Sequence, residues 1–208
     1  MQAHIEHKGS IPFEVTHNQY NFFYLCHMPR KITINDFRKI SPIAQEDIDL
    51  AAQMAEEMGL LENSITGGKG SVHGFLGEIL VARALGIKQA NSRDYDLITS
   101  DGTTIEVKTK RCTTPPRLEY EGSVAKFNPN QKCAFYVFTR IMEDFSAAWI
   151  IGGIEREQFF ELAVQREVGQ RDPNDTPGVG FDFKASCYNL VYRHLKPINY
   201  YNEKVLAS

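Results

Sequence analysis

The stretch Asp94-Tyr-Asp-Leu-Ile-Thr-Ser-Asp-Gly-Thr-Thr-Ile-Glu-Val-Lys-Thr-Lys110 reads as two short strands joined by a tight turn. Two registers are open. A two-residue turn places Asp96 opposite Val107, whereas a three-residue loop with its glycine in the left-handed region places Asp96 opposite Glu106. In the three-residue register the polar side chains of Asp96, Glu106, Lys108 and Lys110 share one face, and Leu97, Ile105 and Val107 share the other. A half-solvated hairpin would show the same separation, so this pattern alone does not distinguish a solvated strand face from a metal site.

Residues 71–85 predict a helix upstream of this hairpin, ended by Gly86. Its apolar residues occupy nearly the whole circumference, which indicates burial on most sides. Glu78 is the anomaly, because its carboxylate emerges from a strip of small and apolar residues. Such a carboxylate shifts its pKa or needs a cationic partner. The alternative to a functional role is that Glu78 pairs with Arg83 or another arginine, or reaches water past the small residues.

The acids of the helix and the hairpin are of the type that binds a hard cation. Mg²⁺ takes one or two carboxylates and keeps water molecules at its remaining positions. Glu78, Asp96 and Glu106 could supply those carboxylates. Lys108, on the same strand face as Glu106, could contact a phosphate oxygen or an attacking water.

This order of residues resembles the PD-(D/E)xK nuclease superfamily, whose motif is a helix acid, an aspartate that opens a hairpin, and a (D/E)-x-K strand. The resemblance covers residues 71–110 and extends more loosely to about 154. It implies an α/β fold with a restriction-endonuclease-like core, in which a central mixed sheet is flanked by helices. It also implies that Asp96, Glu106 and the Val107 carbonyl hold a catalytic Mg²⁺, for which Mn²⁺ would substitute. Lys108 would then position the attacking water, and Glu78 would be the auxiliary acid.

The sequence departs from the family pattern in two places. Tyr95 stands where the motif often has a proline. The superfamily core usually places a helix between its third and fourth strands, whereas residues 134–141 and 147–154 read as an antiparallel hairpin. Either the crossover helix is absent or residues 112–133 supply another element.

Contacts with a nucleic acid would depend on a local basic patch, because the net charge of -3 provides no global positive field. DNA is the expected partner, and candidate contacts to its phosphate backbone are Lys69, His73, Lys110, Arg111 and Arg117. For the segment after the motif, an ordinary solvated connection is an equal alternative.

We expect residues 1–208 to form one nuclease domain. Residues 1–60 would be an N-terminal extension with strands at 11–15, 20–26 and 31–34 and a helix at 43–58. Residues 71–154 would be the catalytic core, and residues 155–208 would contain a short helix (155–163), a polar loop and an aromatic segment. No apolar run approaches the ~20 residues of a membrane span. Scattered cysteines without a leader predict a cytoplasmic protein, bacterial or phage-encoded.

The leading hypothesis is a Mg²⁺-dependent DNA endonuclease that leaves a 5′-phosphate and a 3′-hydroxyl, as the resemblance to this superfamily implies. Because one site cuts one strand, cutting a duplex would suit a twofold homodimer. One alternative is a catalytically silent nucleic-acid-binding or structural module on the same fold. Another is a nuclease that acts on RNA or on branched DNA.

Overall fold

The structure is a computed structural model that describes residues 31–58, 72–90, 92, 94–126, 131–172 and 181–199. All of them belong to the larger of the two units into which the chain divides, Lys31–Ser208. The strands predicted at 11–15 and 20–26, and the candidate Lys69, lie outside the described residues.

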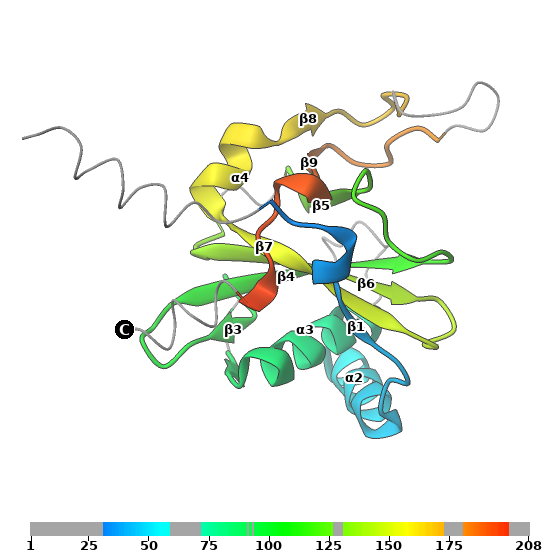
Figure 1. Ribbon diagram of the computed structural model, residues 1–208, viewed down its shortest axis with the longest axis vertical. Coiled ribbons are helices and arrows are strands. Elements are labelled where there is room, and N and C mark those ends of the chain that lie inside the picture. The colour runs from blue at the N-terminus through cyan, green and yellow to red at the C-terminus, as the bar shows by residue number, and fades with distance from the viewer. Residues whose placement is uncertain are drawn as a thin grey trace, which may run out of the picture. The chain divides into compact units, whose positions relative to one another are not determined.

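The described residues form an α/β fold built on two sheets (Figure 1). The larger sheet has six strands in the order β1-β7-β6-β4-β3-β2, and the smaller sheet has three in the order β5-β9-β8. Strands β4 and β6 run parallel while the other neighbours are antiparallel, so the larger sheet is mixed, as predicted. The strands are β1 (Arg38–Ile40), β2 (Lys88–Gln89), β3 (Leu97–Ile98), β4 (Thr104–Cys112), β5 (Glu121–Ala125), β6 (Phe135–Met142), β7 (Ala148–Glu155), β8 (Val164–Arg166) and β9 (Cys187–Val191). The helices are α2 (Gln45–Met58), α3 (Val72–Leu85) and α4 (Arg156–Leu162), with short 3-10 turns at Ile34–Asp36 and Tyr192–His194.

Helices α2 and α3 lie on one side of the larger sheet, and α4 and the smaller sheet lie on the other (Figure 1). On one face, Val81 of α3 packs in one apolar cluster with Ile105 of β4, and α2 packs on α3. On the other face, Phe138 of β6 packs with Phe159 of α4 and Leu190 of β9. Strands buried on both faces need apolar residues at successive positions, which explains the nearly continuous apolar runs of β6 and β7.

Helix α3 approaches the larger sheet closely because Gly77 has no side chain at the crossing point. A Cβ at Gly77 would collide with the Thr109 hydroxyl of β4 and would lie 2.8 Å from the Thr139 hydroxyl of β6. These two hydroxyls are themselves hydrogen-bonded at 2.8 Å. The contact fixes how α3, and therefore Glu78, lies over β4.

The C-terminal half of the predicted core has the hairpin that the sequence indicates. Strands β6 and β7 pair in antiparallel fashion around a short turn, so this prediction is confirmed. The connection from β4 to β6 contains β5, which pairs with β9 in the smaller sheet. Within its described residues this connection has no helix, so residues 112–133 supply another element, a strand.

The predicted strand at 31–34 is wrong. The side chain of Asp36 accepts hydrogen bonds from the Thr33 backbone N–H and from the Thr33 hydroxyl, both at 2.7 Å, and these bonds close a turn. Strand β1 starts only at Arg38. Helix α2 begins at Gln45, two residues after its predicted start. Upstream of it, the Ser41 hydroxyl donates to the Ser146 carbonyl at 3.1 Å. None of the described helices has the length and apolar character that crossing a membrane requires.

Candidate active site

The loop between β3 and β4 has three residues, Ser100-Asp101-Gly102. The Thr99 N–H donates to the Thr103 carbonyl at 3.0 Å, and the Gly102 N–H donates to the Thr99 carbonyl at 3.1 Å. Gly102 has a φ of 86°, in the left-handed region that favours glycine. The predicted three-residue loop is therefore confirmed.

This loop sets the register of the hairpin, which, continued one residue beyond the Leu97–Ile105 pair, puts Asp96 opposite Glu106. Leu97 pairs with Ile105, and the Asp96 N–H donates to the Ile105 carbonyl at 3.0 Å. Leu97 and Ile105 belong to the apolar cluster under α3. Since side chains alternate along a strand, Asp96 and Glu106 face the other side of the sheet.

Each of these two carboxylates contacts a donor on β4. The Val107 N–H donates to Asp96 Oδ2 at 2.7 Å, and Lys108 Nζ donates to Glu106 Oε1 at 2.6 Å. Glu106 is only 6% exposed, so its ion pair with Lys108 neutralises a buried charge. Burial and then the charge of Glu106 raise the pKa of Asp96 to about 7, against the opposing effects of the Val107 N–H and Lys108.

Glu78 reaches the same group of charges from α3. Burial, followed by the charges of Asp96 and Glu106, raises the pKa of Glu78 to about 9, while Lys108 acts in the opposite direction. A side-chain hydrogen bond from Gln89 of β2 also stabilises its ionised form. Glu78 therefore lies within electrostatic range of both hairpin acids and of the lysine.

The arginine considered as a partner of Glu78 is engaged elsewhere. Arg83 forms an ion pair with Asp47 of α2, which is itself buried. Burial raises the pKa of Asp47, and Arg83 opposes that shift. The Arg83–Asp47 pair ties α3 to α2, and among the described residues Lys108 is the cation that lowers the pKa of Glu78.

The acids meet where β4 extends past its pairing with β3. Strand β3 pairs with β4 only at Leu97 and Ile98, so β4 extends past it. The Ile105 carbonyl bonds toward β3. Because backbone groups alternate in direction along a strand, the Val107 carbonyl points to the same side, next to the Asp96 carboxylate that accepts its N–H.

The donor set at this edge fits a hard divalent cation in its chemistry. Asp96 and Glu106 offer carboxylate oxygens, Val107 offers a carbonyl, and oxygen donors of these kinds are what Mg²⁺ takes. Burial is the first cause of the raised pKa values of Glu78 and Asp96, and repulsion from neighbouring acids, which a cation would relieve, is the second. In the described parts of the chain, however, no three His, Cys, Asp or Glu side chains converge in a ready-made metal site. One oxygen of Asp96 and one of Glu106 are instead turned to protein donors.

Of the predicted nucleic-acid contacts, Lys110 and Arg111 line one cleft together. Arg111 forms an exposed ion pair with Glu143 at 3.4 Å. Arg117 is exposed on the connection between β4 and β5 and is not among the cleft residues.

His73 lies near the β6–β7 turn, toward the end of β4 opposite from the acids. Its ring stacks on Phe145 with centroids 4.4 Å apart, and burial lowers its pKa. Its Nε2 has no hydrogen-bond partner in the described part of the chain. His73 and the acids therefore lie over different parts of β4.

Two residues of this region were not predicted from the sequence. Gln89 is a short polar residue on an edge strand and carries no signal of its contact with Glu78. Arg140 lines the cleft beside Lys110 and is only 8% exposed. A single arginine inside the apolar run 135–142 is the same kind of anomaly as Glu78 in its helix, and it could have been found in that way.

Comparison of the chain with models of known protein families gives no match, and comparison with curated protein sequences gives none either.

Proposed function

We propose that this chain is a Mg²⁺-dependent DNA endonuclease with a restriction-endonuclease-like core. The observation that carries the proposal is the register of the β3–β4 hairpin, which sets Asp96 opposite Glu106 with Lys108 beside them. Glu78 supports it, since an acid with a pKa near 9 between two other acids is typical of functional sites. The order helix acid, Asp96, then Glu106-Val107-Lys108 is that of the PD-(D/E)xK motif.

In this proposal Asp96, Glu106 and the Val107 carbonyl hold the cation, with Glu78 as an auxiliary acid. Mg²⁺ would supply Lewis-acid polarisation of the phosphate and would acidify a water molecule. Lys108 exchanges its contact with Glu106 for one with a phosphate oxygen and the attacking water. The water oxygen bonds to phosphorus and the P–O3′ bond breaks, which leaves a 5′-phosphate and, after proton transfer to the leaving oxygen, a 3′-hydroxyl.

The test is cleavage of supercoiled plasmid, linear duplex, single-stranded DNA and RNA with Mg²⁺ or Mn²⁺. We expect Lys108→Ala and Glu106→Ala to lower the rate by at least about a hundredfold, because each removes charge from the transition state. Lys39→Ala on β1 is the control and should cleave as wild type does. Undiminished cleavage by both site variants would contradict the assignment of the site, and cleavage of RNA alone would change the substrate.

A second candidate is a nucleic-acid-binding module without hydrolysis. The 2.6 Å contact between Lys108 and Glu106 favours it, because this ion pair neutralises Glu106 without any cation. In that case Mn²⁺ would leave the melting temperature unchanged, and DNA binding would proceed without cleavage.

A further inference from the structure

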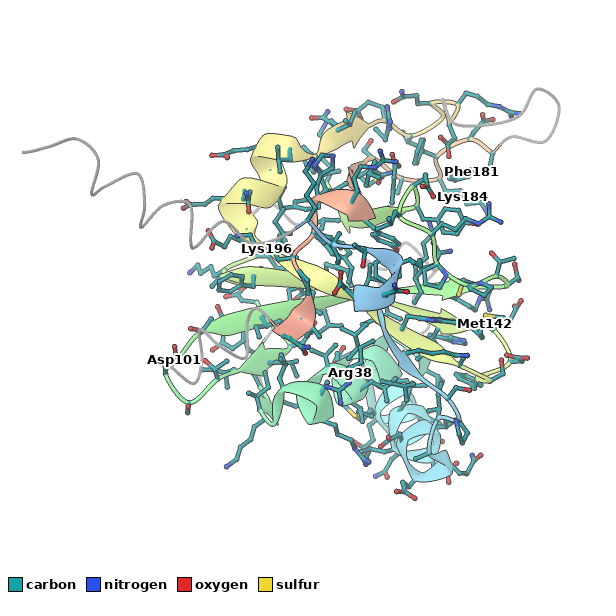
Figure 2. All side chains as sticks on the ribbon, viewed as in Figure 1. Arg38, Asp101, Met142, Phe181, Lys184 and Lys196 are labelled. Atoms are coloured by element: carbon teal, nitrogen blue, oxygen red, sulfur yellow. The ribbon has the colours of Figure 1, made fainter. Side chains whose placement is uncertain are left out.

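A cleft of about 820 Å³ lies between the larger sheet and the smaller sheet. Its lining includes Lys110, Arg140, Tyr120, Glu121, Asn189 and Phe183. Lys110 of β4 and Arg140 of β6 are cross-strand partners, so their side chains leave the same face side by side. Figure 2 shows Lys184, another residue of the lining, on the segment that leads into β9.

Arg140 is a buried cation with unused hydrogen-bonding capacity. It is 8% exposed, its guanidinium lies 4.7 Å from the centre of the Tyr120 ring, and it hydrogen-bonds the Tyr192 hydroxyl. Its Nε finds no acceptor among the described residues. Burying a guanidinium is costly unless an anion or several acceptors meet it, so this position calls for a ligand with oxygen acceptors.

Lys110 adds a second positive charge at the same place. Lys110 is exposed by its surface area, yet partial desolvation by the surrounding protein and then the charge of Arg140 lower its pKa. Glu121 and Asp172 act in the opposite direction without cancelling that effect. Two cations held next to each other in this way attract a phosphate group.

Besides Asp172, the cleft wall carries, among its described residues, three acids that each contact another group. Glu121 accepts a hydrogen bond from Asn189 at 2.8 Å and lies 4.0 Å from Arg166. Glu119 and Glu143 pair with arginines of their own, Arg193 at 3.9 Å and Arg111 at 3.4 Å. These acids therefore oppose an anion at Lys110 and Arg140 less than their number suggests.

The position of the cation pair relates it to the candidate active site. Glu106, Lys108 and Lys110 occupy alternate positions on one face of β4. Two residues along a strand span roughly 6.6 Å, which is on the order of the distance between consecutive phosphates of an extended nucleic-acid strand. A nucleic-acid strand with one phosphate at Lys108 therefore brings its next phosphate to Lys110 and Arg140.

We propose that Lys110 and Arg140 bind the phosphate next to the scissile one, on an unpaired nucleic-acid strand that enters the cleft. The inference rests on the proposed function of the acids and Lys108. An unpaired strand is required because Arg140 lies more than nine-tenths buried between two sheets, where the backbone of an intact duplex cannot follow. The aromatic rings of Tyr120 and Phe183 line the same cleft and offer surfaces on which unpaired bases stack.

The test measures binding separately from cleavage. The anisotropy of a labelled oligothymidylate and of a labelled hairpin duplex is followed in EDTA and in Ca²⁺, over a range of salt concentrations, for the full chain. We expect Lys110→Gln to weaken single-strand binding about tenfold and to reduce the salt slope by about 0.7, the value of one phosphate contact. Arg140→Lys keeps the charge but loses the planar fork, and we expect a similar loss.

Lys39→Gln is the matched control, since Lys39 is an exposed lysine on the edge strand β1. Circular dichroism melts of each variant verify folding, and exposed Lys110 provides the decisive variant if Arg140→Lys melts early. If Lys110→Gln binds the single strand as tightly as Lys39→Gln does, the phosphate site is overturned. It is also overturned if the variants lose as much affinity for the hairpin duplex as for the single strand.

The two proposals fail in different ways. A wild-type protein that cleaves nothing, but whose single-strand binding falls in Lys110→Gln, loses the nuclease function and keeps the phosphate site. A protein whose cleavage depends on Glu106 and Lys108, but whose binding ignores Lys110 and Arg140, keeps the nuclease function and loses the phosphate site. A wild-type protein that binds no single strand overturns the phosphate site directly.

Discussion

Glu78 holds its proton through much of the neutral pH range, because burial and two neighbouring acids raise its pKa to about 9. In the unfolded chain the same group ionises near its ordinary value of 4.5. Between these two pKa values the unfolded state releases a proton that the folded state retains. The contribution of Glu78 to stability therefore falls as the pH rises from 4.5 to about 9, and it is constant outside that window.

We predict that Glu78→Gln removes most of this pH dependence in the metal-free protein. The difference in free energy of unfolding between the variant and wild type should be roughly 2 kcal/mol more favourable to the variant at about pH 8 than at about pH 5. This is less than the full pKa shift would give, because Glu78 keeps some solvent contact. Urea denaturation in EDTA at the two pH values measures it. Glu56→Gln, an exposed glutamate of α2, is the control. If the free energy of unfolding changes with pH in the same way in wild type and in Glu78→Gln, the buried environment assigned to Glu78 is contradicted.

Arg140 and Glu78 show what can be learned about single residues from sequence. Each is a charged residue inside an apolar run, and in each case the structure buries it beside other charges. Glu78 was recognised because its helix is almost free of other polar side chains. Arg140 offers the same kind of signal more weakly, because it follows the polar Thr139 and a strand alternates its faces, so that a polar residue within it is an ordinary pattern.

At the scale of elements, the β3–β4 loop controls which residues face each other. We predict that Gly102→Ala destabilises the protein by about 1 kcal/mol, since a φ of 86° strains a residue with a Cβ. Gly102→Asn should cost less, because asparagine tolerates the left-handed region. No atom of the described residues lies within 4 Å of a Cβ at this position, so we expect the loss to reflect the backbone conformation. Equal stability of the alanine variant and wild type in urea would contradict this account.

Deleting Ser100 separates the length of the loop from the register. The shortened loop Asp101-Gly102 still joins Thr99 to Thr103, so the pairing of Leu97 with Ile105 is kept and Asp96 stays on the side of Glu106. We expect this variant to retain cleavage and metal binding. Gly102→Asn, which keeps the loop length, should also retain both. Loss of both activities in a folded deletion variant would show that the site needs the three-residue loop itself and not only the register.

The packing of α3 on the larger sheet gives a second prediction at this scale. Gly77→Ala should destabilise the protein by about 1–3 kcal/mol, because its methyl group would collide with the Thr109 hydroxyl. Thr109→Ala relieves part of the collision. The double variant should therefore lose less stability than the sum of the two single variants in a double-mutant cycle. Strict additivity would show that Gly77 and Thr109 do not share this contact.

At the scale of the whole molecule, cation binding should raise the free energy of unfolding. At a Mn²⁺ concentration about a hundred times the dissociation constant, we expect wild type to gain about 2.7 kcal/mol. Asp96→Asn should gain much less, and Asp49→Asn on α2 should respond as wild type does. Thermal melts with and without Mn²⁺ measure the difference. The same gain in Asp96→Asn and wild type would place the cation elsewhere.

The parts of the fold that were predicted correctly are those with local signals. The helix at 71–85 carries an uninterrupted apolar pattern and a glycine stop, and both hairpins join strands that are close in sequence. The smaller sheet could not be predicted, because β5 is short, contains a glycine and pairs with a strand that follows much later. The cleft depends on that sheet and was therefore also beyond prediction.

The pairing of β5 with β9 has a consequence for synthesis of the chain. Strand β5 leaves the ribosome before β6, β7 and α4, but its partner β9 follows all of them. Until then β5 lacks this partner, and unpaired strand edges make incompletely folded chains prone to aggregation. The larger sheet can pair its central strands earlier, since β4, β6 and β7 are made in succession. The wall that encloses Lys110 and Arg140 is thus among the last parts of the protein to form.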